Sequence, residues 1–227
     1  RDAQESRGLG DVYKRQIVTC PITKIALRMA GLPWLGHTDM LAELTDTDDY
    51  AMAFYSEPLK LILTTIHVPL KDVPHLIKKE RVIKKIFFAK KACDMLQIEN
   101  PRIAVCGLNP HAGEEGIMGR EEIEEIKPAV SEAKALGINV SGPYPADTIF
   151  RRAFNGEFDI VVAMYHDQAL APFKLIAFDK GVNFTIGLPF IRTSPDHGTA
   201  YDIAWQGKAE PSSLIEAIKL ASRMEIK

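Results

Sequence analysis

The sequence lacks the short motifs that define several large classes of proteins. It contains no Walker motif and no glycine fingerprint of the Rossmann type, which excludes a nucleotide-binding loop of either kind. It also contains no apolar run long enough to cross a membrane, and no internal repeat or low-complexity segment. We therefore expect a globular protein that has no membrane partner.

Cysteine and net charge are also scarce. The formal net charge is -2, and the 28 Lys and Arg residues are dispersed along the chain instead of forming a basic stripe. This distribution argues against a nucleic-acid partner. Three cysteines occur, an odd number without CxxC spacing, which is typical of a reduced cytoplasmic protein. They are Cys20, Cys93 and Cys106.

What the sequence does contain is an alternation of strand-like and helix-like segments. The apolar runs at 17–19, 103–106 and 160–164 are unbroken, which predicts strands covered on both faces of a parallel sheet. Segments 51–55 and 59–65 predict an antiparallel hairpin. The pattern is typical of an α/β fold. Between the strands we expect helices over 24–30, 78–96, 121–136 and 211–224.

Polar residues predict where some helices begin. Thr38 is expected to cap a helix over 40–44, and Ser212 or Ser213 is expected to cap the C-terminal helix. Each has a hydroxyl that can accept a hydrogen bond from a free N–H group of the first turn.

A rigid turn over 142–148 is expected after a short strand at 138–140, and it presents Asp147 before a helix. Two interpretations of Asp147 are open on these grounds. The side chain is either the N-cap of the helix or a catalytic acid or base.

The stretch from Asp159 to Arg192 carries most of the side chains that suggest a binding site. Tyr165-His166-Asp167-Gln168 follows directly after a buried strand, where open α/β sheets bind their ligands. Lys174, Asn183 and Arg192 follow in turn-rich, otherwise apolar segments. The two cations suit a phosphate or carboxylate, and the amide can orient it. That apolar context makes simple surface charge the weaker interpretation.

Three histidines suggest a metal site. His37, His111 and His166 each follow a strand-like segment or turn and precede a helix, and they lie 74 and 55 residues apart. Three neutral imidazoles leave open positions on a divalent ion for substrate oxygens. A lone histidine is more often structural, so the spacing alone does not show that they converge. His67 and His75 flank a proline-bounded loop, and we interpret both as structural or surface residues.

The first residues of the chain need a separate interpretation. Asp11–Gln16 (DVYKRQ) is the literal translation of a transposon-end adaptor used in sequencing libraries. The strand-like run at Ile17 then begins abruptly. We expect residues 1–16 to be a non-native, adaptor-derived tail on a truncated reading frame, with a polar natural terminus as the alternative.

Five sequence blocks occur in one order along the chain: GHTDM (36–40), GLNPHAGEEGIMGREE (107–122), GPYPADTIF (142–150), MYHDQALAPFK (164–174) and GVNFTIGLPFIRTSPDHGTAYD (181–202). Together they resemble the PdxA family of vitamin B6 biosynthesis, the 4-hydroxythreonine-4-phosphate dehydrogenases. The resemblance runs from Ile17 to the C-terminus.

The resemblance implies an isocitrate/isopropylmalate-dehydrogenase-like fold, with two α/β domains and a mixed sheet. Residues 17–108 and 199–227 would form the first domain, and 109–198 the second, which carries most of the site. Both would be incomplete, because members of the family have a substantial N-terminal region before the strand at Ile17. The family also implies a homodimer with its active site at the subunit interface.

By the same resemblance, His37, His111 and His166 would hold a divalent metal (Zn, Mg or Co) shared between the two subunits. Lys174, Asn183 and Arg192 match substrate-binding positions of the family. Asp147 matches an acidic residue near the metal, and Asp147 and Lys174 are the candidates for proton transfer. No residues that bind the nicotinamide cofactor can be identified.

The implied function is NAD- or NADP-dependent oxidation and decarboxylation of 4-phosphohydroxy-L-threonine to 3-amino-2-oxopropyl phosphate, in pyridoxal 5'-phosphate biosynthesis. A paralogue acting on threonate or erythronate 4-phosphate is the nearest alternative. A non-redox metal enzyme such as a lyase, and an inactive fragment that only binds metal or dimerises, are the others.

Overall fold

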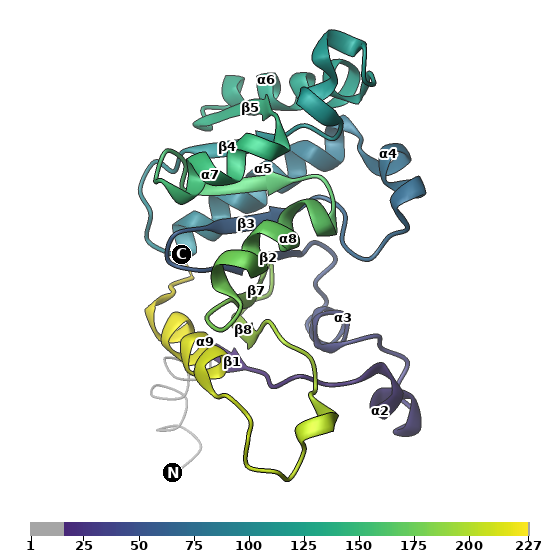
Figure 1. Cartoon of the computed structure of the whole chain (residues 1–227), viewed down its shortest axis with the longest axis vertical. Coiled ribbons are helices and arrows are strands. Elements are labelled where there is room, and N and C mark those ends of the chain that lie inside the picture. The colour runs from purple at the N-terminus through teal and green to yellow at the C-terminus, as the bar shows by residue number, and fades with distance from the viewer. Residues whose placement is uncertain (1–15, 227) are drawn as a thin grey trace.

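A computed structural model of the chain describes residues 16–226, and its backbone is organised around one eight-stranded sheet (Figure 1). The strands lie across the sheet in the order β1-β8-β7-β2-β3-β6-β4-β5. Their bounds are β1 (Gln16–Val18), β2 (Ala51–Tyr55), β3 (Lys60–Leu63), β4 (Ile103–Cys106), β5 (Val140–Tyr144), β6 (Ile160–Ala163), β7 (Val182–Ile186) and β8 (Ile191–Pro195).

Helices and short helical turns connect the strands. None of the described helices is long and apolar enough to cross a membrane. The helices are α2 (Lys24–Met29), α3 (His37–Glu43), α4 (Val73–Leu76), α5 (Lys79–Met95), α6 (Lys127–Ala135), α7 (Ala146–Phe154), α8 (His166–Ala177) and α9 (Ser212–Arg223). The turns are η1 (Leu70–Asp72), η2 (Pro110–Gly116), η3 (Glu122–Ile126) and η4 (Tyr201–Ile203). Of the predicted tail, residues 1–15 lie outside the described residues, and Gln16 is the first residue of β1.

The sheet is mixed. β3, β6, β4 and β5 run parallel to one another, as does β1 to β8, whereas β7 is antiparallel to both of its neighbours. The predicted hairpin is confirmed, because β2 and β3 pair antiparallel with Phe54 opposite Leu61.

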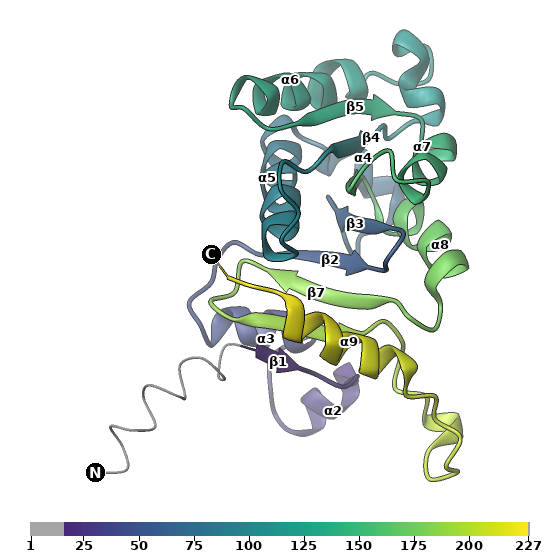
Figure 2. The same cartoon turned by 90° about the vertical axis from the view of Figure 1, so that its left-hand side faces the viewer.

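The central strands are covered on both faces, as the apolar runs at 103–106 and 160–164 predict. The same prediction for 17–19 is wrong, because β1 lies at the edge of the sheet and Ile17 is exposed. Alternate side chains of a strand point to opposite faces, so neighbouring residues enter different cores. Val105 and Val162 enter the core covered by α5, α6 and α9, whereas Ala104 and Val161 enter the core covered by α7 and α8 (Figure 2). This double burial anchors the strands whose ends form the site.

The predicted helix caps are wrong, because tertiary partners take the hydroxyl groups. α3 begins at His37 after Gly36, and the Thr38 hydroxyl accepts a hydrogen bond from Arg192 at 3.4 Å. α9 begins after Pro211 without a side-chain cap, and the Ser213 hydroxyl donates to the carbonyl of Gly181 at 2.9 Å.

The segment predicted as a rigid turn over 142–148 is instead partly strand. β5 starts at Val140 and continues through the cis Gly142–Pro143 bond to Tyr144. β5 is the last strand of the sheet, where the N–H group that proline lacks is not needed for pairing. Gly142 is required there, because its φ is +130° and an added Cβ would lie 2.5 Å from the carbonyl oxygen of Val105.

Replacing Phe173 with Ala is expected to lower the free energy of unfolding by about 3–5 kcal/mol, because a large cavity replaces a buried ring. Phe173 is fully buried on α8 and packs edge-on against Phe54, with ring centres 5.8 Å apart. Urea unfolding followed by circular dichroism measures the change. The control is Met29→Ala on α2, where the side chain is 84% exposed and the expected loss is below about 0.5 kcal/mol. Equal losses in both variants would contradict this account of the core.

Candidate functional site

A cavity of about 330 Å³ gathers five of the seven predicted site residues. Its lining includes His37 on α3, His166 and Lys174 on α8, Asn183 on β7 and Arg192 on β8. The structure therefore brings together residues up to 155 positions apart in the chain. His111 and Asp147 do not line this cavity.

One helix and two paired strands present four of these side chains. His166 and Lys174 lie eight residues apart on α8, which is two helical turns and hence the same face. Asn183 is the second residue of β7, and Arg192 is the second residue of β8. The two strands are antiparallel neighbours, and the Arg192 guanidinium donates to the Asn183 side-chain oxygen at 3.4 Å.

Arg192 is a buried cation surrounded by neutral partners. It is only 6% exposed, and it donates to the hydroxyls of Thr19 (2.8 Å), Thr38 (3.4 Å) and Thr185 (3.3 Å). Burial lowers its pKa to about 10, and no carboxylate of the described residues opposes that effect. A guanidinium held in a cavity without a counter-charge is suited to bind an anion such as a phosphate or carboxylate.

Lys174 has a partner that the sequence analysis did not identify. Its Nζ donates to the backbone carbonyl of Asp196 at 3.3 Å and lies 3.9 Å from the Asp196 carboxylate. Burial raises the pKa of Asp196, and the positive charge of Lys174 opposes this shift. The neighbouring lysine and carboxyl group give the cavity a second polar corner, apart from Arg192.

His67 is the main residue that the sequence analysis missed. Its ring lies beside that of His166, with centres 5.6 Å apart and planes tilted by 40°, and both line the cavity. Burial and the neighbouring His166 lower the pKa of His67. The available signal was its position: His67 follows β3 just as His166 follows β6, and β3 and β6 are parallel neighbours.

The His67–His166 pair fits a shared divalent ion. Two imidazoles that bind one ion at about 2.1 Å in tetrahedral geometry have ring centres roughly 5 Å apart. The observed separation is 5.6 Å. Burial and the charge of Arg192 lower the pKa of His37, which favours neutral imidazole there as well. Within residues 16–226, however, no group of three His, Cys, Asp or Glu side chains is close enough to hold a metal. The predicted triad of histidines therefore stays a prediction.

His111 is displayed at the surface by an unusual turn. Residues His111–Glu115 have positive φ values of 53, 53, 80, 43 and 55°, and four of the five are not glycine. Left-handed backbone costs an L-residue about 1–2 kcal/mol, so other contacts must hold this turn. The His111 side chain is 64% exposed, and its Nδ1 lies 3.6 Å from a carboxylate oxygen of Glu114.

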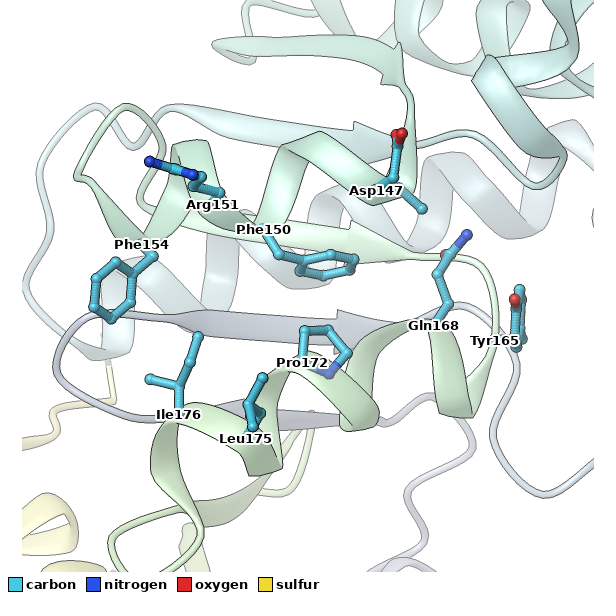
Figure 3. A pocket seen from close by; sticks show the side chains of 10 residues that line it. Asp147, Phe150, Arg151, Phe154, Tyr165, Gln168, Pro172, Leu175 and Ile176 are labelled. Atoms are coloured by element: carbon cyan, nitrogen blue, oxygen red, sulfur yellow. The ribbon is translucent and has the colours of Figure 1, made fainter.

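Asp147 lies in a different hollow from His166. Figure 3 shows it at the edge of an apolar groove between α7 and α8, together with Phe150, Phe154 and Leu175. The N-cap interpretation of Asp147 is wrong, because Pro145 is the N-cap and no side chain caps α7. The groove has a volume of about 540 Å³. Leu175 is 89% exposed and Phe154 is 44% exposed, so the groove is an open apolar face.

Replacing Arg192 with Met is expected to abolish any stabilisation of the chain by inorganic phosphate, because it removes the buried cation that would pair with the anion. Added inorganic phosphate should stabilise the wild-type chain, by about 2.7 kcal/mol at a hundred times its dissociation constant. The variant should lose this response. Urea unfolding with and without phosphate at matched ionic strength makes the comparison.

The matched control for this prediction is Arg28→Met on α2, where the arginine is exposed and lies outside the cavity. Arg28→Met should keep the full response to phosphate. A response of the same size in the Arg192→Met chain would mean that the anion binds elsewhere.

Comparison with known proteins identifies the relatives of this chain. Residues 10–221 match the family described as pyridoxal phosphate biosynthetic protein PdxA. The chain is 56% identical over 205 residues to the 4-hydroxythreonine-4-phosphate dehydrogenase of Aquifex aeolicus (strain VF5), covering 90% of this chain and 63% of the relative. It is 49% identical over 215 residues to the D-threonate 4-phosphate dehydrogenase of Pectobacterium atrosepticum, covering 95% of this chain and 65% of the relative. The chain thus spans less than two thirds of these relatives.

Solved structures agree with these matches. The crystal structure of 4-hydroxythreonine-4-phosphate dehydrogenase from Klebsiella pneumoniae is similar with a TM-score of 0.85 at 49% identity, covering 92% of this chain and 63% of that one. Isocitrate dehydrogenase from Methylococcus capsulatus shares the fold alone, with a TM-score of 0.53 at 14% identity over 96% of this chain and 69% of that one. The predicted isocitrate-dehydrogenase-like α/β fold is confirmed, whereas the two domain boundaries stay predictions. With the family match extending over residues 10–221, the chain belongs to the PdxA family.

Proposed function

We propose that the complete protein oxidises 4-phosphohydroxy-L-threonine with NAD or NADP and releases carbon dioxide, giving 3-amino-2-oxopropyl phosphate for pyridoxal 5'-phosphate biosynthesis. One observation carries this proposal: the guanidinium of Arg192, which pairs with no carboxylate of residues 16–226, shares a cavity with the His67–His166 imidazole pair. An anion-binding group beside a metal-type pair suits a phosphorylated hydroxy acid. The name of the Aquifex aeolicus relative supports the substrate.

His67 and His166 are the proposed metal ligands within one chain, with His111 of a second copy as the third. His111 and His166 were expected from the sequence, and His67 takes the role expected of His37 because its ring adjoins His166. His37 lies close enough to Arg192 for that charge to lower its pKa, so its proposed role is to contact the substrate. A bound Zn, Mg or Co ion would supply a Lewis acid for the substrate hydroxyl.

The remaining side chains bind the substrate and move its proton. Arg192 pairs with an anionic end of the substrate, and Asn183, hydrogen-bonded to Arg192, orients that group. Lys174 lines the cavity opposite Asp196 and is the proposed carrier of the hydroxyl proton. Asp147, the other candidate from the sequence, lines the groove instead of this cavity in a single copy.

The proposed site for the nicotinamide cofactor is a second cavity of about 480 Å³, which shares His197 and Gly198 with the first. Phe178 and Ile203 give its wall an apolar surface suited to a flat ring. The shared residues would bring the cofactor next to the substrate, as hydride transfer requires. NAD or NADP would supply the hydride acceptor.

D-threonate 4-phosphate is the second candidate substrate. The Pectobacterium atrosepticum relative carries that name at 49% identity, close to the 56% of the Aquifex aeolicus relative. The two substrates share the phosphate and the hydroxyl and differ at the amino group. Activity with one substrate and not with the other distinguishes them.

A homodimer would complete the metal site. α7 packs against η2, which displays His111, and the open groove lies between α7 and α8, which begins with His166. In a two-fold interface the same patch meets itself, so each copy can give a residue to the other. The groove between α7 and α8 is therefore the proposed contact, with His111 of each copy reaching the histidine pair of the other.

Reduction of NAD or NADP at 340 nm with 4-phosphohydroxy-L-threonine is the expected activity of the complete parent protein, and a chelator should abolish it. His67→Ala should lower the bound metal and the rate by at least about 100-fold, because a ligand is lost. The control is His75→Ala, since His75 is exposed and outside the cavity. Metal-bound protein that turns over substrate without cofactor reduction would indicate a non-redox enzyme. Absence of both activities would indicate an inactive, metal-binding protein.

Leu175→Asp is expected to convert the homodimer to a monomer, because it puts a charge into the apolar groove. Analytical ultracentrifugation measures the dissociation constant, which should rise by at least about 100-fold. Leu70→Asp is the control, since Leu70 is 67% exposed on η1, away from the groove. Dimers of equal strength in both variants would mean that another face makes the contact.

A further inference from the structure

Glu122 is a buried carboxylate that is held by N–H groups. Its side chain is 1% exposed. Its Oε1 accepts from the backbone N–H groups of Leu108 and Asn109, both at 2.7 Å, and its Oε2 accepts from the side-chain amide of Asn109 at 2.9 Å. These partners lie 13 and 14 residues away in the sequence, at the start of the turn that carries His111. The carboxylate therefore anchors a distant backbone segment instead of pairing with a cation.

The turn is built closely around this carboxylate. A Cβ added to Gly107 would lie 3.0 Å from Oε1 of Glu122, and one added to Gly113 would lie 2.6 Å from Oε2. The backbone thus passes the carboxylate on both sides of His111, and glycine is needed at both places. The Asn109 carbonyl in turn accepts from the N–H group of Ala112 at 3.1 Å. A short path of hydrogen bonds connects Glu122 to the residue next to His111.

The position of His111 depends on this backbone, because its own side chain has little else to hold it. The ring is 64% exposed and has one contact with a charged group, the 3.6 Å approach to Glu114. The left-handed conformation of His111–Glu115 is unfavourable without anchoring contacts. Glu122 supplies such contacts at the beginning of the turn.

A second buried side chain connects the same segment to His166. Gln168, which is 8% exposed, donates to the carbonyl of Gly107 at 2.8 Å and accepts from the N–H group of Met164 at 2.7 Å. It thus ties the end of β4 to the end of β6, two residues before α8 begins at His166. The turn anchored by Glu122 is therefore held at a fixed position relative to the histidine pair.

We propose that Glu122 is a positioning residue for the metal site and acts through His111. Its carboxylate fixes the left-handed turn, so that the imidazole is presented in one orientation. The proposal rests on the proposed function in one respect, the use of His111 as a ligand by a second copy. Removing a group that orients a metal ligand in this way usually lowers the affinity for the metal by about 10–100-fold.

The first test is the affinity of the dimeric chain for Co²⁺, read from its visible absorption. Glu122→Ala should weaken binding about 10–100-fold and reduce the absorption, since one imidazole is lost from the ion. Glu122→Gln should fall between Glu122→Ala and the wild type, because its amide oxygen can still accept both backbone N–H bonds while its NH2 group cannot accept from the Asn109 amide. Glu124→Ala, which removes an exposed carboxylate two residues away, should leave affinity and spectrum unchanged.

A double-mutant cycle decides whether Glu122 acts through His111. In a His111→Ala background, adding Glu122→Ala should change Co²⁺ affinity by less than about twofold, because the ligand it positions is already absent. An equal loss in both backgrounds would overturn the proposal. If His111→Ala alone binds Co²⁺ like the wild type, the ligand assignment of the proposed function fails.

Hydrogen exchange of the metal-free chain tests the anchoring role of Glu122 separately from the assignment of His111 as a ligand. In Glu122→Ala the amides of residues 112–118 should exchange faster, whether or not His111 binds an ion. Unchanged exchange would overturn the anchoring role itself. Should Glu122→Ala not fold, Glu122→Asp tests the same contact, since the shorter side chain withdraws the carboxylate from both backbone N–H groups while the charge remains.

Discussion

The parallel pairing of β3, β6 and β4 in the middle of the sheet is the constraint on which the site depends. Parallel strands that pair side by side end at the same edge, and each of these three continues into a segment that carries a histidine. His67 follows β3, His166 follows β6 and His111 follows β4. The hydrogen-bonded pairing of these strands and their side chains buried on both faces hold the ends of the three strands in place. The positions of the three imidazole-bearing segments are thus set by core packing.

Two buried charges of opposite sign complete this arrangement. Arg192 donates to hydroxyls and an amide, and Glu122 accepts from N–H groups, so both are solvated by neutral dipoles of the protein. Neutral partners satisfy hydrogen bonds without cancelling charge. At Arg192 the uncancelled charge faces a cavity and can attract an anion. At Glu122 the charge strengthens the hydrogen bonds that hold a strained turn. The same device, a buried charge with neutral partners, thus serves binding at Arg192 and positioning at Glu122.

Most of the fold could be predicted from the sequence, because periodic apolar patterns determine it locally. Strands β2, β3, β4 and β6 and helix α5 fall within two residues of their predicted bounds. The errors have a common cause in tertiary contacts that no local pattern contains. The Thr38 and Ser213 hydroxyls read as caps but bond to distant groups. Gly142–Pro143 reads as a turn, yet an edge strand accommodates it.

The site was predictable to the extent that its residues carry a recognisable pattern. His37, His166, Lys174, Asn183 and Arg192 meet in one cavity, whereas His67 was missed because only the pairing of β3 with β6 brings it to His166. His111 is the opposite case. The sequence predicted it as a metal ligand, but its side chain is exposed in a single copy of the chain. Strained backbone persists where surrounding contacts impose it, and it is concentrated at binding sites. A turn strained to display an imidazole outward is consistent with the proposed homodimer, in which a second copy takes that imidazole as a ligand.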